Sequence, residues 1–185
     1  MMKKRAVFLD RDDTLIRNIP YLGDPSRVEI LPGVREGLPR LKEAGLELFL
    51  VSNQSGVGRG LITEAQVHAV NEEMFRRLGA GLFSGLYLCY AAPEDPQGVR
   101  ERKPSPTMLF RARDENNIEL AESFMLGDRL SDVRCGLNAG CCSVLVLSGY
   151  EDAEADKRQA QDLAHHVAAD FCGAVDWILS RMLET

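Results

Sequence analysis

The stretch Arg-Ala-Val-Phe-Leu-Asp-Arg-Asp-Asp at residues 5–13 combines a short apolar run with an abrupt acidic end. A run of this length is typical of a strand that is buried on both faces of a parallel sheet. In parallel α/β sheets, ligands bind beyond the carboxyl ends of the strands. The sequence therefore predicts a strand over residues 5–9 that delivers carboxylates directly to a binding edge.

Apolar runs and helical patterns alternate along the rest of the chain, after a loop rich in proline and glycine at 14–32. The further strands are predicted at 46–51, 85–90, 123–126 and 143–147. The helices are predicted at 33–44, 63–78, 105–116, 130–138 and 171–183, with polar loops at 52–60 and 91–103, a polar stretch at 149–162 and a short run at 166–169. This order predicts one domain over residues 1–185, an α/β fold of three layers with a doubly wound, Rossmann-like parallel sheet and helices on both faces.

The composition excludes several classes of protein. The 185 residues are 45% hydrophobic and 27% charged, with a net charge of −6, which argues against a nucleic-acid partner. The longest apolar stretches, at 46–51 and 141–147, are far shorter than the roughly 20 residues of a membrane span, and the run at 6–9 is too short for a signal peptide. Five cysteines without Cys-x-x-Cys spacing predict reduced thiols, so we expect a cytoplasmic protein.

Polar side chains follow the predicted strands where their carboxyl ends meet. They are Asp10 and Asp12, then Ser52 and Asn53, then Arg102 and Lys103, and then Asp128 and Asp132. Two carboxylates about 4 Å apart repel each other by on the order of 4 kcal/mol at an effective dielectric constant of 20. A divalent cation offsets this repulsion, and oxygen ligands suit Mg²⁺. A magnesium site beside a lysine and an arginine suits a phosphoryl group.

The spacing of Asp10 and Asp12 predicts a division of labour between them. A carboxylate at the strand tip can attack phosphorus and form an aspartyl-phosphate. The side chain two residues later can point at the same substrate from the following turn, protonate the leaving alkoxide and later accept a proton from water. Such a general acid–base contributes about 10²–10⁴-fold to the rate.

Four segments, at 8–15, 51–56, 102–104 and 127–132, resemble in order the four motifs of the haloacid dehalogenase (HAD) superfamily. They are most similar to its small, nearly capless branch, which holds the heptose-bisphosphate and histidinol-phosphate phosphatases. The resemblance extends from residue 7 to about residue 179. It implies a HAD-like fold with a minimal cap or none, and a Mg²⁺-dependent phosphatase that acts on a small phosphorylated metabolite.

The resemblance also implies roles for single residues. Asp10 corresponds to the nucleophile and a metal ligand, and Asp12 to the acid–base, with its backbone carbonyl on the metal. Ser52 and Lys103 correspond to the groups that hold the phosphoryl oxygens. Asp128 corresponds to the remaining metal ligand, with Asp132 beside it, either binding through water or serving only as a charge in the first turn of a helix.

Further residues correspond to the substrate-contacting segments of that branch. They are Asn18, Ile19, Pro20 and Tyr21, then Ser52, Asn53, Gln54 and Ser55, and then Arg102 and Lys103. For Arg59, in the glycine-flanked loop, the sequence leaves open whether it contacts substrate.

One feature of the branch is missing from this chain. Relatives carry a zinc site of the pattern Cys-x-His and Cys-x-Cys before Arg-Lys-Pro, whereas these positions here hold Cys89, Ala91, Val99 and Glu101. One thiolate cannot hold a structural zinc ion, which takes four ligands. We therefore predict no zinc, and a loop at 91–101 that is either held by its prolines and packing or mobile.

Several alternatives stay open at this point. The first-choice substrate is a sugar bisphosphate of the heptose type, and histidinol phosphate or another phosphomonoester is the second. A phospho-acceptor signalling module also has strand-end aspartates around Mg²⁺, but it lacks an acid–base at the position of Asp12. A catalytically inactive scaffold is disfavoured because every catalytic position is filled. By resemblance, we expect a monomer.

Overall fold

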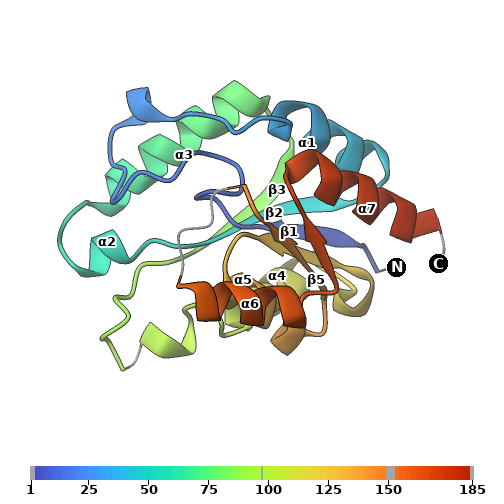
Figure 1. Ribbon diagram of the computed structural model, residues 1–185. Helices are drawn as coiled ribbons and strands as arrows, with labels where there is room; N and C mark the ends of the chain where they lie inside the picture. Colours follow the sequence, from blue (N-terminus) through green and yellow to red (C-terminus); the bar gives the residue numbers. More distant parts are fainter. Residues whose placement is uncertain (1–2, 97, 149–152, 184–185) are drawn as a thin grey trace.

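The computed structural model describes residues 3–96, 98–148 and 153–183, and its centre is a parallel sheet of six strands (Figure 1). The strands lie in the order β3-β2-β1-β4-β5-β6. Their bounds are Ala6–Leu9 for β1, Glu47–Asn53 for β2, Phe83–Cys89 for β3, Phe124–Gly127 for β4, Cys142–Val146 for β5 and His166–Ala168 for β6. The strand order reverses at β1, which pairs with β2 on one side and β4 on the other. In such sheets a crevice forms at the carboxyl ends of the strands where the order reverses. The topology therefore places the binding edge at β1, β2 and β4.

Helices cover both faces of the sheet (Figure 1). One layer holds α1 (Val34–Glu43), α3 (Glu64–Leu78) and α7 (Phe171–Leu183), and the other holds α4 (Thr107–Asn116), α5 (Leu130–Ala139) and α6 (Glu154–Leu163). A single turn of helix, α2 (Ser55–Gly58), follows β2. Because side chains alternate along a strand, Val7 and Leu9 of β1 pack into the first layer, and Ala6 and Phe8 pack into the second. Burial of each large apolar side chain contributes roughly 1.5–3 kcal/mol.

The predicted fold class is confirmed, and most predicted elements differ from the observed ones only by a residue or two at their ends. The start predicted for the helix at 63–78 is confirmed in detail. Thr63 and Gln66 form a reciprocal capping box there, in which each side chain bonds the other residue's backbone amide. Pro39 lies within α1 without ending it.

One predicted loop is wrong in part, and a stretch described only as polar holds a helix. The segment 52–60 holds the last two residues of β2 and then α2, while the polar stretch at 149–162 ends in α6. Helix α6 buries only Ala160, so its apolar signal is too weak for a pattern to detect. Residues 149–152 lie outside the described residues. Within the described part of the chain, no helix is both long and apolar enough to cross a membrane.

The sequence predicts reduced thiols for the five cysteines. All five are free. Cys89, Cys135 and Cys141 are buried, whereas Cys142 and Cys172 are partly exposed.

Candidate active site

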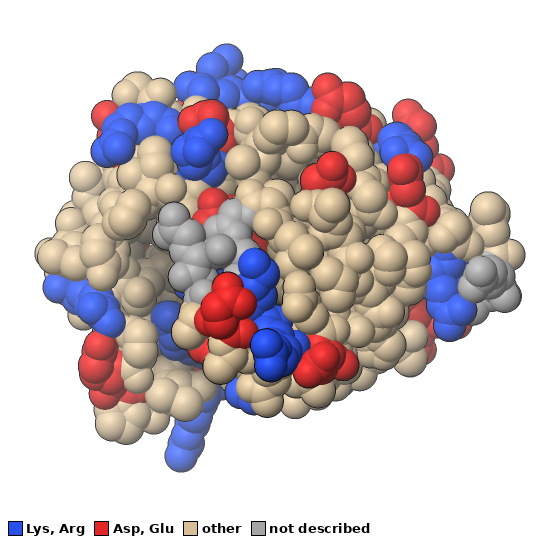
Figure 2. Space-filling model, in the orientation of Figure 1, with Lys and Arg blue, Asp and Glu red and all other residues tan. Residues whose placement is uncertain are grey.

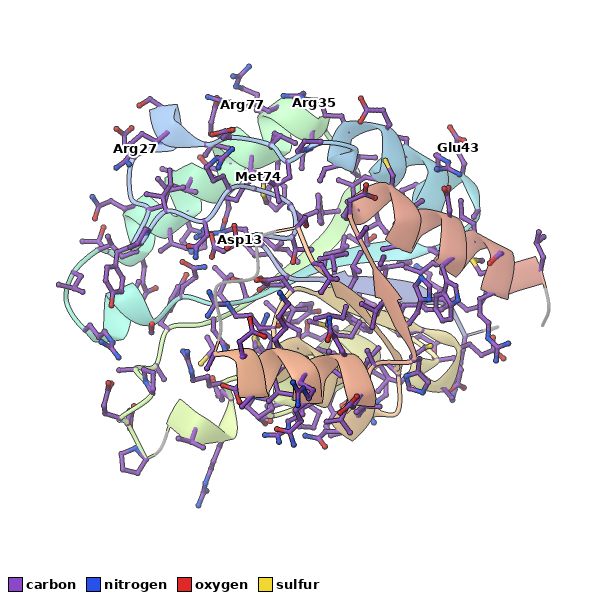
Figure 3. All side chains as sticks on the ribbon, viewed as in Figure 1. Asp13, Arg27, Arg35, Glu43, Met74 and Arg77 are labelled. Carbon is purple, nitrogen blue, oxygen red and sulfur yellow. The ribbon has the colours of Figure 1, made fainter. Side chains whose placement is uncertain are left out.

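A tight loop after β1 presents Asp10 at the strand tip. The backbone amide of Asp10 donates to the carbonyl of Leu126 in β4, which ties this residue to the centre of the sheet. The chain then turns back at Asp13, whose φ of 58° is left-handed, a conformation that Asp tolerates better than most residues. The Asp13 carboxylate accepts a hydrogen bond from the amide of Asn18, and Figure 3 labels Asp13 near the centre of the molecule. The loop is therefore braced by its own hydrogen bonds.

Lys103 reaches Asp10 from the far end of the 91–103 segment. Its Nζ lies 2.5 Å from Asp10 Oδ1 and 2.6 Å from Asp132 Oδ1, and it also donates to the carbonyl of Val51 at 2.9 Å. The side chain is only 2% exposed. Burial opposes the charge on Lys103, but the two carboxylates more than offset this and raise its pKa above the usual value. Lys103 is therefore a fixed positive charge beside the strand tip.

Three buried carboxylates gather at this point. Asp10, Asp128 and Asp132 each place a carboxylate oxygen within 4.8 Å of the others. Gly127 permits this, because a Cβ there would come within 2.4 Å of Asp132. Asp132 also accepts a hydrogen bond from the amide of Arg129 at the start of α5.

The electrostatics of this cluster fit a hard divalent cation. Asp128 is 1% exposed, and neither of its carboxylate oxygens has a hydrogen-bond partner. Burial, with the charges of Asp10 and Asp132, raises its pKa well above the ordinary range. Burial likewise raises the pKa of Asp10 to about 6, although Lys103 acts in the opposite direction. Buried carboxylate oxygens without donors suit a cation that prefers oxygen ligands.

Asp12, Ser52 and Gln54 form a second group beside the carboxylates. The Asp12 side chain is 22% exposed and lines the cavity described below. The Gln54 side chain donates from Nε2 to Asp12 Oδ2 and to Ser52 Oγ, both at 2.9 Å. The side-chain amide of Gln54 thus joins Asp12, the predicted acid–base, to Ser52, the predicted phosphoryl-binding residue.

A cavity of about 620 Å³ at the carboxyl edge of the sheet is lined by Asp10, Asp12, Ser52, Gln54, Lys103 and Asp132, whereas Asp13 and Asp128 lie outside its lining. Every residue predicted to contact substrate lines it too: Asn18, Ile19, Pro20, Tyr21, Ser52, Asn53, Gln54, Ser55, Arg102 and Lys103. Asn53 and Gln54, however, have their amide groups bonded to protein neighbours. Tyr21 is 44% exposed.

The two arginines considered from the sequence differ in position. Arg102 is partly buried in the cavity wall, with Nη1 donating to the carbonyl of Ala91 at 3.4 Å. Arg59 is paired with Glu94 at 2.6 Å on the surface and does not line the cavity.

Sequence reasoning missed part of the cavity wall. Arg129, at the N-cap of α5, and Arg134, within α5, line it, and Asp156 lines it from α6. Arg129 directly follows Asp128, so its position beside a predicted metal ligand was the available signal. No signal in the sequence indicates Asp156, because the pattern does not predict the helix that carries it.

The segment 91–101, where relatives are expected to carry zinc, is held by hydrogen bonds in this chain. It contains a 3₁₀ turn, Gly98–Arg100. The hydroxyls of Ser105 and Thr107 donate to the carbonyl of Arg100 at 2.6 Å and 2.8 Å. Burial raises the pKa of the Cys89 thiol, which disfavours the thiolate that a metal would bind.

Several known proteins are similar to this chain over most of its length. The sequence model of the HAD-hydrolase-like family matches residues 101–174. The chain is 32% identical to the D-glycero-D-manno-heptose-1,7-bisphosphate 7-phosphatase of Thermosynechococcus vestitus over 98% of both chains. It is 35% identical to the D-glycero-beta-D-manno-heptose-1,7-bisphosphate 7-phosphatase of Yersinia pestis, covering 97% of this chain and 92% of that one.

Among solved structures, the D,D-heptose 1,7-bisphosphate phosphatase from B. bronchiseptica, complexed with magnesium and phosphate, superposes with a TM-score of 0.82. It is 26% identical and covers 96% of this chain and 99% of that one. The predicted resemblance is therefore confirmed, and the relatives are enzymes rather than signalling modules. The chain belongs to the heptose-bisphosphate phosphatase family of the haloacid dehalogenase superfamily and is a phosphatase.

Proposed function

We propose that this phosphatase hydrolyses a sugar bisphosphate of the D-glycero-D-manno-heptose 1,7-bisphosphate type. The observation that carries the proposal is the convergence of Asp10, Lys103, Asp128 and Asp132 at the carboxyl edge of the sheet, beneath a cavity lined by Asp12 and Ser52. The names of the relatives support the class of substrate. Figure 2 shows basic and acidic side chains interspersed on the visible face, which suits a small substrate better than a nucleic acid.

Asp10, Asp128 and the backbone carbonyl of Asp12 would hold Mg²⁺, with Asp132 beside them. When bound, the cation neutralises the carboxylates and stabilises negative charge on the phosphoryl oxygens. The Asp128 oxygens, which accept no hydrogen bond, support this assignment, as does the magnesium in the relative from B. bronchiseptica.

The chain's own residues then perform two transfers. An Asp10 carboxylate oxygen attacks phosphorus, the bond from phosphorus to the sugar oxygen breaks, and Asp12 gives its proton to that oxygen. Water next attacks the same phosphorus, the bond to Asp10 breaks, and the water proton passes to Asp12. Ser52 and Lys103 hold the phosphoryl oxygens throughout. Each cycle thus returns both aspartates to their starting states.

The proposal includes three finer points. The protein needs no zinc, since Ala91, Val99 and Glu101 stand where relatives are expected to have ligands. It acts as a monomer, which light scattering at several concentrations tests. It works in the cytoplasm, a reducing compartment that suits five free cysteines.

A substrate panel tests the proposal. Phosphate release is measured with Mg²⁺, and with EDTA as control, on heptose 1,7-bisphosphate, fructose 1,6-bisphosphate, histidinol phosphate and a nucleoside monophosphate. We expect the highest kcat/KM on the heptose bisphosphate and loss of turnover in EDTA. A preference for histidinol phosphate, or turnover that is unaffected by EDTA, contradicts the proposal.

A further inference from the structure

Arg11 has the largest of the fully buried side chains in the described part of the chain, at 1% exposure. It stands between Asp10 and Asp12 in the sequence, and the reaction outlined above gives it no role. A guanidinium stays charged at any ordinary pH, so its burial is tolerated only where polar partners surround it. The identity of those partners therefore indicates its purpose.

The guanidinium makes its most extensive contact with Asp12. Nη2 lies 3.1 Å from both carboxylate oxygens of Asp12, and Nε donates to Oδ1 at 3.2 Å. The remaining partners come from two other elements. Nη2 also donates to Gln54 Oε1 at 2.9 Å, and Nη1 donates to Asn71 Oδ1 of α3 at 3.0 Å. The planar group is thus fixed from three directions.

Gln54 closes this arrangement on the other side. Its oxygen accepts from Arg11, and its nitrogen donates to Asp12 Oδ2 and to Ser52 Oγ. The Asp12 carboxylate is consequently held by two side chains that are themselves buried. Its own exposed surface faces the cavity.

We propose that Arg11 is a positioning residue for the reaction. It fixes the Asp12 carboxylate in the orientation from which a proton reaches the leaving oxygen, and Gln54 ties that carboxylate to Ser52 in one frame. This inference rests on the proposed function, in which Asp12 is the acid–base. A misplacement of about 1 Å in a reacting group can cost on the order of 10²-fold in rate.

A positioning role and a purely structural role for Arg11 predict different results when the leaving group of the substrate is changed. A sugar alkoxide must be protonated as it leaves, whereas 4-nitrophenolate leaves without a proton near neutral pH. Loss of a well-placed acid therefore slows the sugar ester and spares the nitrophenyl ester. General damage to the site slows both equally.

The experiment measures kcat/KM of the Mg²⁺-loaded full chain on heptose 1,7-bisphosphate and on 4-nitrophenyl phosphate. This constant reports the steps up to cleavage of the first phosphorus–oxygen bond. We expect Arg11→Gln to lose about 10²-fold on the sugar ester and less than about 5-fold on the nitrophenyl ester. The matched control is Arg40→Gln, which removes an arginine–aspartate pair on the surface, at 2.7 Å from Asp176, and changes neither constant.

Should Arg11→Gln fail to fold, as judged by circular dichroism, Asn71→Ala replaces it. That variant removes only the hydrogen bond from Arg11 Nη1 to Asn71 and is expected to show the same selective loss at about 5-fold. If a folded variant of an active enzyme loses equally on both esters, the positioning role of Arg11 is contradicted. The proposed function is not affected by that result. A wild-type chain that hydrolyses neither ester contradicts the proposed function, and with it the acid–base role on which this inference rests.

Discussion

The side-chain amide of Asn53 exchanges two hydrogen bonds with the main chain of Lys103. Nδ2 donates to the Lys103 carbonyl at 3.2 Å, and Oδ1 accepts from the Lys103 amide at 3.1 Å. The ammonium group of the same lysine donates to the carbonyl of Val51. Strand β2 therefore holds both the backbone and the ammonium group of Lys103. The Asn53 side chain binds the backbone, and the Val51 carbonyl binds the ammonium group.

Replacement of Asn53 is expected to act through this lysine. Asn53→Ala removes both backbone hydrogen bonds and lets Lys103 shift relative to Asp10, so kcat should fall about 10- to 10²-fold. Steady-state phosphate release measures the effect. The matched control is Asn138→Ala, which removes the hydrogen bond from α5 to the next carbonyl, that of Pro104, at 3.0 Å. An equal loss in both variants would mean that the whole segment has moved rather than the lysine.

Asp10→Asn is expected to abolish phosphate release, because an amide does not attack phosphorus. The variant should also fail to acquire covalent phosphate from substrate, which mass spectrometry of the acid-quenched protein detects. Turnover retained in Asp10→Asn would remove Asp10 as the nucleophile.

Asp12→Asn should keep Mg²⁺ binding and lose about 10²–10⁴-fold in rate on a sugar phosphate. Steady-state phosphate release measures the rate.

The buried carboxylate of Asp128, which accepts no hydrogen bond and has only a long ion pair with Arg129 at 3.7 Å, should destabilise the metal-free protein. Asp128→Asn removes a buried charge that has no hydrogen-bond donor, so the free energy of unfolding in EDTA at pH 7.5 should rise by roughly 1–3 kcal/mol. Urea denaturation measures it. A variant that is less stable than the wild type in EDTA contradicts this account of the site.

The pH dependence of that difference follows from the direction of the pKa shifts. Folding raises the pKa of Asp128 well above 3.8 and that of Asp10 to about 6. Protonation therefore favours the folded state, and this stability is complete below the unfolded pKa and is lost as pH rises through the folded pKa. The advantage of Asp128→Asn over the wild type should grow from about pH 4 to about pH 7.5. Comparing the two chains cancels groups with the opposite shift, such as Glu47.

Magnesium should offset this difference in stability. A ligand that binds only the folded state adds about 2.7 kcal/mol at roughly 100 times its Kd. The wild type should gain this stability from Mg²⁺, and Asp128→Asn should gain much less. Thermal melting with increasing Mg²⁺ measures both. Equal gains would place the cation away from Asp128.

Zinc content tests the interpretation of the segment 91–101. Elemental analysis of the purified protein should find no stoichiometric zinc. Cys89→Ala should leave activity and the Mg²⁺ requirement unchanged, since the thiol is a small buried group there. One zinc ion per chain would contradict the proposal.

The parts of this protein that could be predicted from its sequence depend on short-range patterns. The apolar run that becomes β1 is followed at once by Asp10, and the strand–helix alternation is strong enough to give the parallel sheet. The strand-end rule then brings Asp10, Lys103 and Asp128 to one edge without further information. Here local pattern and global fold agree.

What could not be predicted depends on contacts between distant parts of the chain. No sequence pattern shows that Arg11 is buried, because its burial requires Asn71 of α3 and Gln54 after β2 to approach it. The amide of Asn53 was expected at substrate, and its bonding to Lys103 appears only when β2 and the segment before α4 meet. Helix α6 escaped detection because it packs against its neighbours through so little apolar surface.

The central position of β1 in the sheet bears on how the enzyme loses activity. Strands β3 and β6 form the two edges of the sheet, and local unfolding begins at such edge strands. The amide hydrogens of β1 should therefore be among the slowest to exchange with deuterated solvent. In mild denaturant, turnover should persist while the edges open and vanish only in the final cooperative step.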